Sequence, residues 1–164
     1  MKAIIFAPEN NTQILIIIIE IMEDGNVTMM YQGRVHTFRK SELRPLQEEA
    51  LQEMRQLVME LMSGNDTTPL AWKSTSTDLV EMINDVYMVC DVKDARGCSL
   101  TFTYMVETIY RRFMKPVPKN PRSYAYRAKM RKSVRQSSLI DRWVLMKLNG
   151  MEPRSVFVVR SERE

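Results

Sequence analysis

The sequence predicts an α+β fold. A small N-terminal antiparallel sheet and a long helix would precede a helical C-terminal module of helix-turn-helix or winged-helix type. Isoleucine-rich runs and turn residues fill roughly the first forty positions, which is typical of short strands. Apolar residues then recur every three or four positions, which is typical of helices. Basic residues concentrate between positions 111 and 147, in the C-terminal half.

Three strands are expected at the N-terminus. Residues 13–22 are rich in isoleucine, and turn residues around Gly25 lead into a second extended run at 27–31. A turn at Gly33 would return the chain as a third strand at 34–38. The two-residue period of a strand places Val35, Thr37 and Arg39 on one face and Arg34, His36 and Phe38 on the other.

A long helix is expected next, as a cover for this sheet. Its apolar stripe consists of Leu43, Leu46, Ala50, Met54, Leu57 and Leu61. Pro45 would belong to the first turn, where a missing N–H costs little, and Gly64 would end the helix. The loop that follows, at 67–74, contains Pro69 and predicts a boundary between a strand-plus-helix module at 1–66 and a basic helical module at 67–164.

Four helices are expected in the C-terminal module. Thr75 and Asp78 suit the start of the first helix, and Ser99 suits the cap of the second, which would end near Phe113. Pro121 fits the first position of a third helix running to about residue 133. A fourth helix would start near residue 137 and end at 149–150. Residues 155–159 resemble a strand, which could form a wing or join the N-terminal sheet.

The positive charge of this chain is local. Residues 111–147 hold twelve basic residues and one acid, Asp141, for a net charge of +11, whereas the whole chain carries only +4. The remainder therefore carries −7. A basic segment with so few acids favours the binding of a polyanion over a solvated helical face, which usually mixes both signs. Asp141 is expected to hold one of the arginines in place.

Double-stranded DNA is the polyanion that the pattern favours, because only the third helix of the three in residues 76–134 is strongly basic. Helical spacing puts Arg122, Tyr126 and Lys129 on one stripe and Tyr124, Arg127 and Arg131 on the next. The two tyrosines could equally be core or rim residues. The candidate DNA-binding residues are Arg111, Arg112, Lys119, Arg122, Tyr124, Tyr126, Arg127, Lys129, Arg131, Lys132 and Arg135.

The residues give little support to an enzyme. His36 is the only histidine, and Cys90 and Cys98 lack the spacing of a zinc site, so we expect no catalytic residues, no metal, no cofactor and no small-molecule substrate. The longest apolar run, at 14–19, is far shorter than the roughly 20 residues that cross a bilayer. We therefore expect a cytoplasmic protein without membrane contact.

The C-terminal half, at about 70–148, resembles the RteC family, which regulates excision of tetracycline-resistance conjugative elements. The likeness lies in the segments LAWKS at 70–74, TDLVEMI at 77–83, YAYRAKMR at 124–131 and LID at 139–141, which follow in the same order. The resemblance implies a winged-helix or helix-turn-helix domain that activates transcription of excision genes. It would put Tyr124 and Arg131 in the recognition region and Trp72 and Leu79 in the core. The first 65 residues do not resemble the larger helical N-terminal domain of that family.

Two alternatives to DNA binding remain open. The basic segment could dock an acidic protein partner or the acidic half of its own chain, or it could bind RNA, which would call for more exposed aromatic residues. A homodimer would fit the DNA-binding interpretation, because such proteins commonly read paired half-sites. Its contact could be the N-terminal isoleucine-rich edge or the apolar stripe on residues 43–61.

Overall fold

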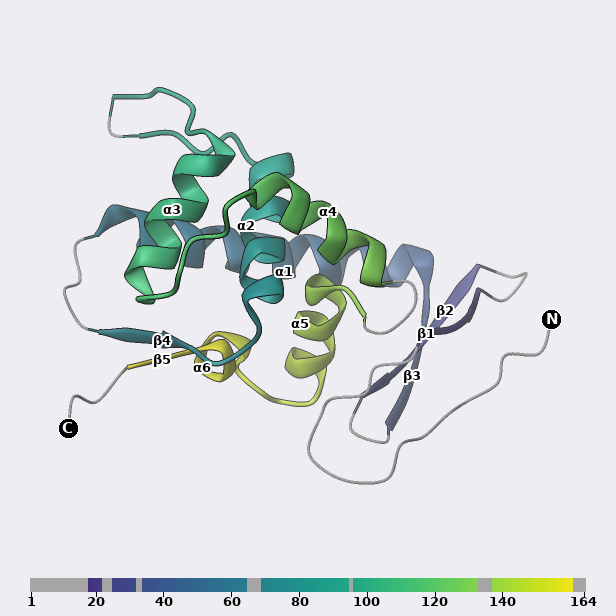
Figure 1. Ribbon diagram of the computed structural model, residues 1–164. Coiled ribbons are helices and arrows are strands. Elements are labelled where there is room, and N and C mark those ends of the chain that lie inside the picture. Colours follow the sequence, from purple (N-terminus) through teal and green to yellow (C-terminus); the bar gives the residue numbers. More distant parts are fainter. Residues whose placement is uncertain are drawn as a thin grey trace.

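The structure is a computed structural model that describes residues 18–21, 25–31, 34–64, 69–94, 96–132 and 137–160. It confirms the α+β class: a three-stranded sheet and a long helix are followed by further helices and a second, two-stranded sheet (Figure 1). In Figure 1 the three-stranded sheet lies at one end of the helical body and the two-stranded sheet lies beneath its other end.

The N-terminal sheet is antiparallel, in the order β1-β2-β3, with β1 Ile18–Ile21, β2 Asn26–Tyr31 and β3 Arg34–Arg39. The predicted alternation along the third strand is confirmed where side chains are described. Val35, Thr37 and Arg39 are exposed, whereas His36 and Phe38 are half-buried. The inner face reaches the end of the fourth C-terminal helix, where the Asn149 amide lies 3.4 Å from His36 Nε2. The His36 ring also stacks on Phe38 of the same strand, with ring centroids 6.2 Å apart.

The long helix α1, Lys40–Ser63, begins earlier than the sequence predicts. The carboxylate of Glu42 accepts a hydrogen bond from the backbone N–H of Arg39 at 3.1 Å, and this contact fixes the start. The expectation that Pro45 lies in the first turn is therefore wrong. Pro45 lies inside the helix, where it removes one hydrogen bond to the carbonyl of Ser41. Gly64 ends the helix in the left-handed conformation, with φ of 65°.

The apolar stripe of α1 faces the core of its own chain. Leu43, Ala50, Met54, Leu57 and Leu61 are all buried. The suggestion that this stripe provides a dimer contact is therefore wrong, because these side chains already pack inside the monomer.

The predicted loop at 67–74 contains a strand. β4, Leu70–Trp72, pairs antiparallel with β5, Val158–Arg160, and the backbone N–H of Lys73 donates to the carbonyl of Phe157 at 2.8 Å. A short helix, α6 Pro153–Phe157, precedes β5. The strand-like tail thus begins later than predicted, and it joins β4 and not the N-terminal sheet.

The C-terminal helices are α2 Ser76–Val89, α3 Phe102–Arg112, α4 Pro121–Lys132 and α5 Leu139–Leu148. Thr75 caps α2 as predicted, since its hydroxyl accepts from the backbone N–H of Asp78 at 3.0 Å. The cap predicted for α3 is wrong: Thr101 caps the helix, and the Ser99 hydroxyl donates to Asp91 at 2.6 Å instead. Ser99 and Leu100 belong to the connection before α3, where Lys93 and Ser99 form an isolated bridge.

The buried side chains form one cluster, which draws residues from both sides of the predicted boundary at 66/67. Three aromatic rings stack at its centre. Phe157 lies between Trp72 and Trp143, with ring centroids 5.3 and 5.5 Å away. Because α1 shares this core with α5, α2 and α3, the two predicted modules do not have separate cores among the described residues. The division into two modules stays a prediction.

Candidate nucleic-acid interface

Helix α4 packs on the rest of the protein through its small side chains. Pro121, Ala125 and Ala128 are buried, and the helix lies mainly against α2 and less extensively against α3 (Figure 1). A proline and two alanines allow the backbone to approach α2 closely and leave the remaining face uncovered. The inward face of the helix is narrow, and Met130 is 58% exposed.

The outward face of α4 carries the first predicted stripe. Arg122 and Lys129 are exposed and Tyr126 is 64% exposed. The helix contains no acidic residue, and no acid among the described residues lies within ion-pair distance of Arg122 or Lys129. These two cations are therefore available to an external anion.

The second stripe lies at the border between α4 and the core. Tyr124 is half-buried, and the guanidinium of Arg127 lies 5.2 Å from the centre of its ring. Arg127 is itself exposed, and its Nε donates to the carbonyl of Ser123 at 3.4 Å. The stacking holds the guanidinium at the edge of the exposed face. Tyr124 thus has the rim position that the sequence left open, whereas Tyr126 lies fully outside.

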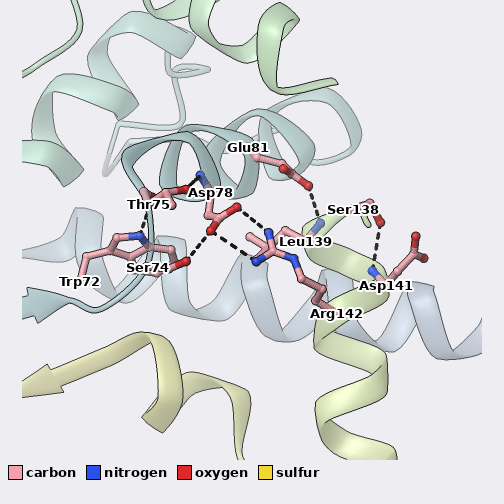
Figure 2. A network of polar contacts seen from close by, with 9 residues as sticks. All are labelled: Trp72, Ser74, Thr75, Asp78, Glu81, Ser138, Leu139, Asp141 and Arg142. Carbon is pink, nitrogen blue, oxygen red and sulfur yellow. Dashed lines mark hydrogen bonds and ion pairs between the residues drawn. The ribbon is translucent and has the colours of Figure 1, made fainter. Parts of the chain in front are cut away.

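Two cations of the basic segment are turned inward. Arg142 and Asp78 form an ion pair in which both side chains are only 4% exposed, with Nη2 2.5 Å from Oδ1 and Nη1 3.3 Å from Oδ2. Figure 2 shows that this pair joins the first turn of α2 to the first turn of α5. Arg142 therefore contributes to the protein interior and not to an anion-binding surface.

A network of hydrogen bonds surrounds this pair (Figure 2). Ser74 Oγ also donates to the carboxylate of Asp78, and Trp72 Nε1 donates to the carbonyl of Thr75 at 2.9 Å. Burial alone would raise the pKa of Asp78, but the hydrogen bonds and charge of Arg142, with the hydrogen bond of Ser74, outweigh it and lower the pKa below its ordinary value. The carboxylate is thus held in its charged form.

The start of α5 is fixed by two further contacts in the same region. The Glu81 carboxylate accepts from the backbone N–H of Leu139, and Ser138 Oγ accepts from the backbone N–H of Asp141 at 3.0 Å. Asp141 itself accepts from Gln47 Nε2 at 2.7 Å. The expectation that Asp141 holds an arginine is therefore wrong. The acid that does so is Asp78, 64 positions away in the sequence.

Lys147 is the second cation that pairs within the chain. Its Nζ donates to Glu49 Oε1 at 2.7 Å and also to Glu53, whose other oxygen accepts from Trp143 Nε1 at 2.8 Å. The hydrogen bonds that Lys147 donates to Glu49 and Glu53 raise the pKa of Lys147. Burial works against a charged Glu53, but Lys147 and Trp143 lower the pKa of that carboxyl. Part of the basic segment thus packs on acids of α1.

The structure does not bring all the candidate residues together. Arg111 is exposed and lies 3.4 Å from Glu107 of its own helix. Arg112 is half-buried and lines a cavity with residues of α1, α6 and the β4–β5 sheet. In Figure 1 this sheet lies away from α4. Lys119 is exposed in the connection that leads into α4. The side chains of Arg131 and Lys132, and all of Arg135, lie outside the described residues.

Sequence reasoning missed the buried pair of Asp78 with Arg142. One signal was available: Arg142 follows Leu139 by three positions and precedes Leu145 by three, so it shares a helix face with two buried leucines. A charged residue on an apolar face calls for a buried partner. The sequence could not say which of the chain's acids provides it.

Within the described part of the chain, no group of histidine, cysteine and acidic residues is placed to hold a metal ion. No helix in the same part is long and apolar enough to cross a membrane. Comparisons with known protein families, with curated proteins and with solved structures find no match to this chain.

Proposed function

We propose that this protein binds double-stranded DNA through the exposed face of α4 and does not act as an enzyme. The observation that carries the proposal is the pairing pattern of the basic segment. Cations at its C-terminal end are neutralised by acids of the same chain, whereas Arg122 and Lys129 on α4 have no such acid among the described residues. A helix with free cations and a narrow inner face can approach a phosphate backbone without losing its packing.

The exposed side chains suit duplex DNA better than single strands. Arginine can pair bidentately with a guanine edge, and lysine can neutralise a phosphate as a point charge. Tyr126 is the only exposed aromatic residue among those described on α4, whereas single-strand and RNA binders stack bases on several aromatic rings. Arg122, Arg127 and Lys129 would thus make the contacts, with Arg127 positioned by Tyr124.

The helix-turn-helix assignment is a part of this proposal that rests on element order. Helices α2, α3 and α4 follow one another, and α4 packs on the first of them. The connection from α3 to α4 spans residues 113–120, which is longer than the roughly 3–4-residue turn of the standard motif. The resemblance to the RteC family adds a proposed role in transcription on a mobile element.

The test is the affinity for a random-sequence duplex, measured by fluorescence anisotropy on the double variant Arg122→Gln, Lys129→Gln. We expect weakening of roughly tenfold or more at low salt, since two phosphate contacts are lost. The matched control is Arg44→Gln, Arg55→Gln, which removes the same charge from exposed positions on α1. Equal weakening in both variants would mean that net charge, and not the α4 face, determines binding.

The second candidate is a module that binds an acidic protein, and the pairing of Lys147 with Glu49 and Glu53 favours it. This contact shows that acids of the same chain do attract part of the basic segment. Competition between polyglutamate and duplex DNA distinguishes the two candidates. Under the DNA proposal, polyglutamate at equal charge displaces the duplex only weakly, whereas an acid-binding module would prefer polyglutamate.

A homodimer remains part of the proposal. Because the apolar stripe of α1 is buried, the dimer contact would be the edge of β1. Among the described residues β1 pairs with β2 on one side only, and an open strand edge can pair with a second copy. Light scattering with increasing protein concentration tests this: a constant monomer mass would remove the dimer.

A further inference from the structure

A second cluster of cations lies away from α4, around the cavity between α1, α3 and the β4–β5 sheet. Three arginines line this cavity from three different elements: Arg112 at the end of α3, Arg154 on α6 and Arg160 on β5. Among the described residues that line it, Glu60 of α1 is the only acid. These lining residues therefore carry two more positive than negative charges.

The cations around this cavity differ in their pairing. Arg154 donates to Glu60 with both terminal nitrogens of its guanidinium: Nη1 lies 3.0 Å from Oε1, and Nη2 contacts Oε2. Arg112 is half-buried and Arg160 is exposed, and no acid among the described residues lies within ion-pair distance of either. The negative end of the α3 dipole stabilises the charge of Arg112. It does not account for a second unpaired cation, Arg160, on the same cavity.

The size and floor of the cavity limit what it can bind. Its volume is about 190 Å³, whereas pockets for drug-sized ligands start at roughly 300 Å³. Leu57, Leu61 and Leu70 contribute apolar walls, which weaken the competition from water for a charged group. A guanidinium presents a planar fork of donors that fits two oxygens of a phosphate or carboxylate. The cavity thus suits a single oxyanion and not a larger molecule.

We infer that this cavity is a binding site for a small oxyanion, phosphate or carboxylate, held by Arg112 and Arg160 with Arg154 at its side. Glu60 is an internal competitor, because its carboxylate already occupies the fork of Arg154. The site is separate from the α4 face, so the inference does not depend on DNA binding.

Titration calorimetry on the full chain in chloride buffer tests the site, with inorganic phosphate and acetate as probes at matched ionic strength. We expect binding of at least one probe, weakened about tenfold or more in Arg112→Gln and in Arg160→Gln, because each loses charged hydrogen bonds. Arg160→Gln is on an exposed position and keeps the test valid if Arg112→Gln fails to fold. The matched control, Arg55→Gln, removes an exposed cation of α1 and should bind as the unchanged protein does.

Glu60→Gln separates a binding site from a structural ion pair. Loss of the competing carboxylate should tighten binding of the probe, by up to about fivefold, since an exposed pair contributes only modestly. A purely structural pair would leave the probe affinity unchanged. The preferred probe identifies the oxyanion class.

The inference is overturned if neither probe binds above chloride, if Arg55→Gln weakens binding equally, or if Arg112→Gln weakens duplex DNA binding as strongly as Arg122→Gln, Lys129→Gln does.

Discussion

The pairing of Asp78 with Arg142 decides the stability of the junction between α2 and α5. Both side chains are buried, and a buried ion pair stabilises a protein only when its geometry and its other hydrogen bonds are favourable. Asp78 meets this condition, since Ser74 and two nitrogens of Arg142 donate to it. If either residue were removed, the other would be left as a buried charge without an oppositely charged partner.

Replacement of Asp78 by alanine should therefore lower the free energy of unfolding by about 3–5 kcal/mol, the typical cost of breaking a buried pair. Urea unfolding followed by circular dichroism measures this. The control is Glu107→Ala, which removes an exposed ion pair with Arg111 and should cost no more than about 1 kcal/mol. Similar losses in both variants would show that the buried pair has no special role.

The same pair predicts how stability depends on pH. The pKa of Asp78 is lowered in the folded protein. At a pH below the ordinary carboxyl pKa, the unfolded chain therefore binds a proton at this position more readily than the folded protein does. Stability from this group is complete above pH about 4 and is lost as the pH falls through the lowered pKa.

Asp78→Asn should lack this acid-side loss. The difference between its unfolding free energy and that of the unchanged protein should shrink as the pH falls from 5 toward 2. Urea unfolding of both proteins, repeated at intervals of roughly half a pH unit, measures this difference. A constant difference over that range would contradict the assigned pKa.

At the scale of elements, helix positions could largely be predicted from the sequence because their signals are local. Thr75 and Pro121 lie where α2 and α4 begin, as predicted, since capping and proline geometry depend only on neighbouring residues. Contacts between distant segments could not be predicted in this way. The pairing of β4 with β5 joins residues about 88 positions apart, and a three-residue strand has too short a pattern to be read.

In the candidate site, too, features set by local sequence could be predicted, and contacts between distant segments could not. The exposure of Arg122, Tyr126 and Lys129 could be predicted from helical spacing. The acids that pair with Arg142 and Lys147 could not be predicted, because they lie on α1 and α2 and only the tertiary fold brings them close. Arg112 likewise faces a cavity that forms only when α6 and β5 fold back on α1.

The packing of α4 through alanine makes a prediction at this scale. Ala128 is 2% exposed against α2, so Ala128→Leu should force the helices apart and cost about 1–3 kcal/mol. Chemical denaturation measures the loss. Met130→Ala, at a position 58% exposed, is the control and should change stability by less than about 0.5 kcal/mol. A fully tolerated leucine would mean that α4 does not pack closely on α2.

At the scale of the whole molecule, the charge of the sequence is redistributed by folding. The basic segment carries +11 and the rest of the chain −7, yet the two do not simply cover each other. Glu49 and Glu53 of α1 neutralise Lys147, whereas no acid among the described residues forms an ion pair with Arg122 or Lys129 of α4. Unpaired cations thus remain on α4 and around the separate cavity that Arg112 and Arg160 line.

The most direct test of DNA binding through α4 is the salt dependence of affinity for a random-sequence duplex. Helix α4 holds five cations in its sequence, Arg122, Arg127, Lys129, Arg131 and Lys132. Each neutralised phosphate contributes about −0.9 to the slope of log affinity against log salt concentration. We predict a slope of about −4 or steeper, reduced to about −2 or −3 in Arg122→Gln, Lys129→Gln. No binding at low salt, or an unchanged slope in that variant, would contradict DNA binding through this helix.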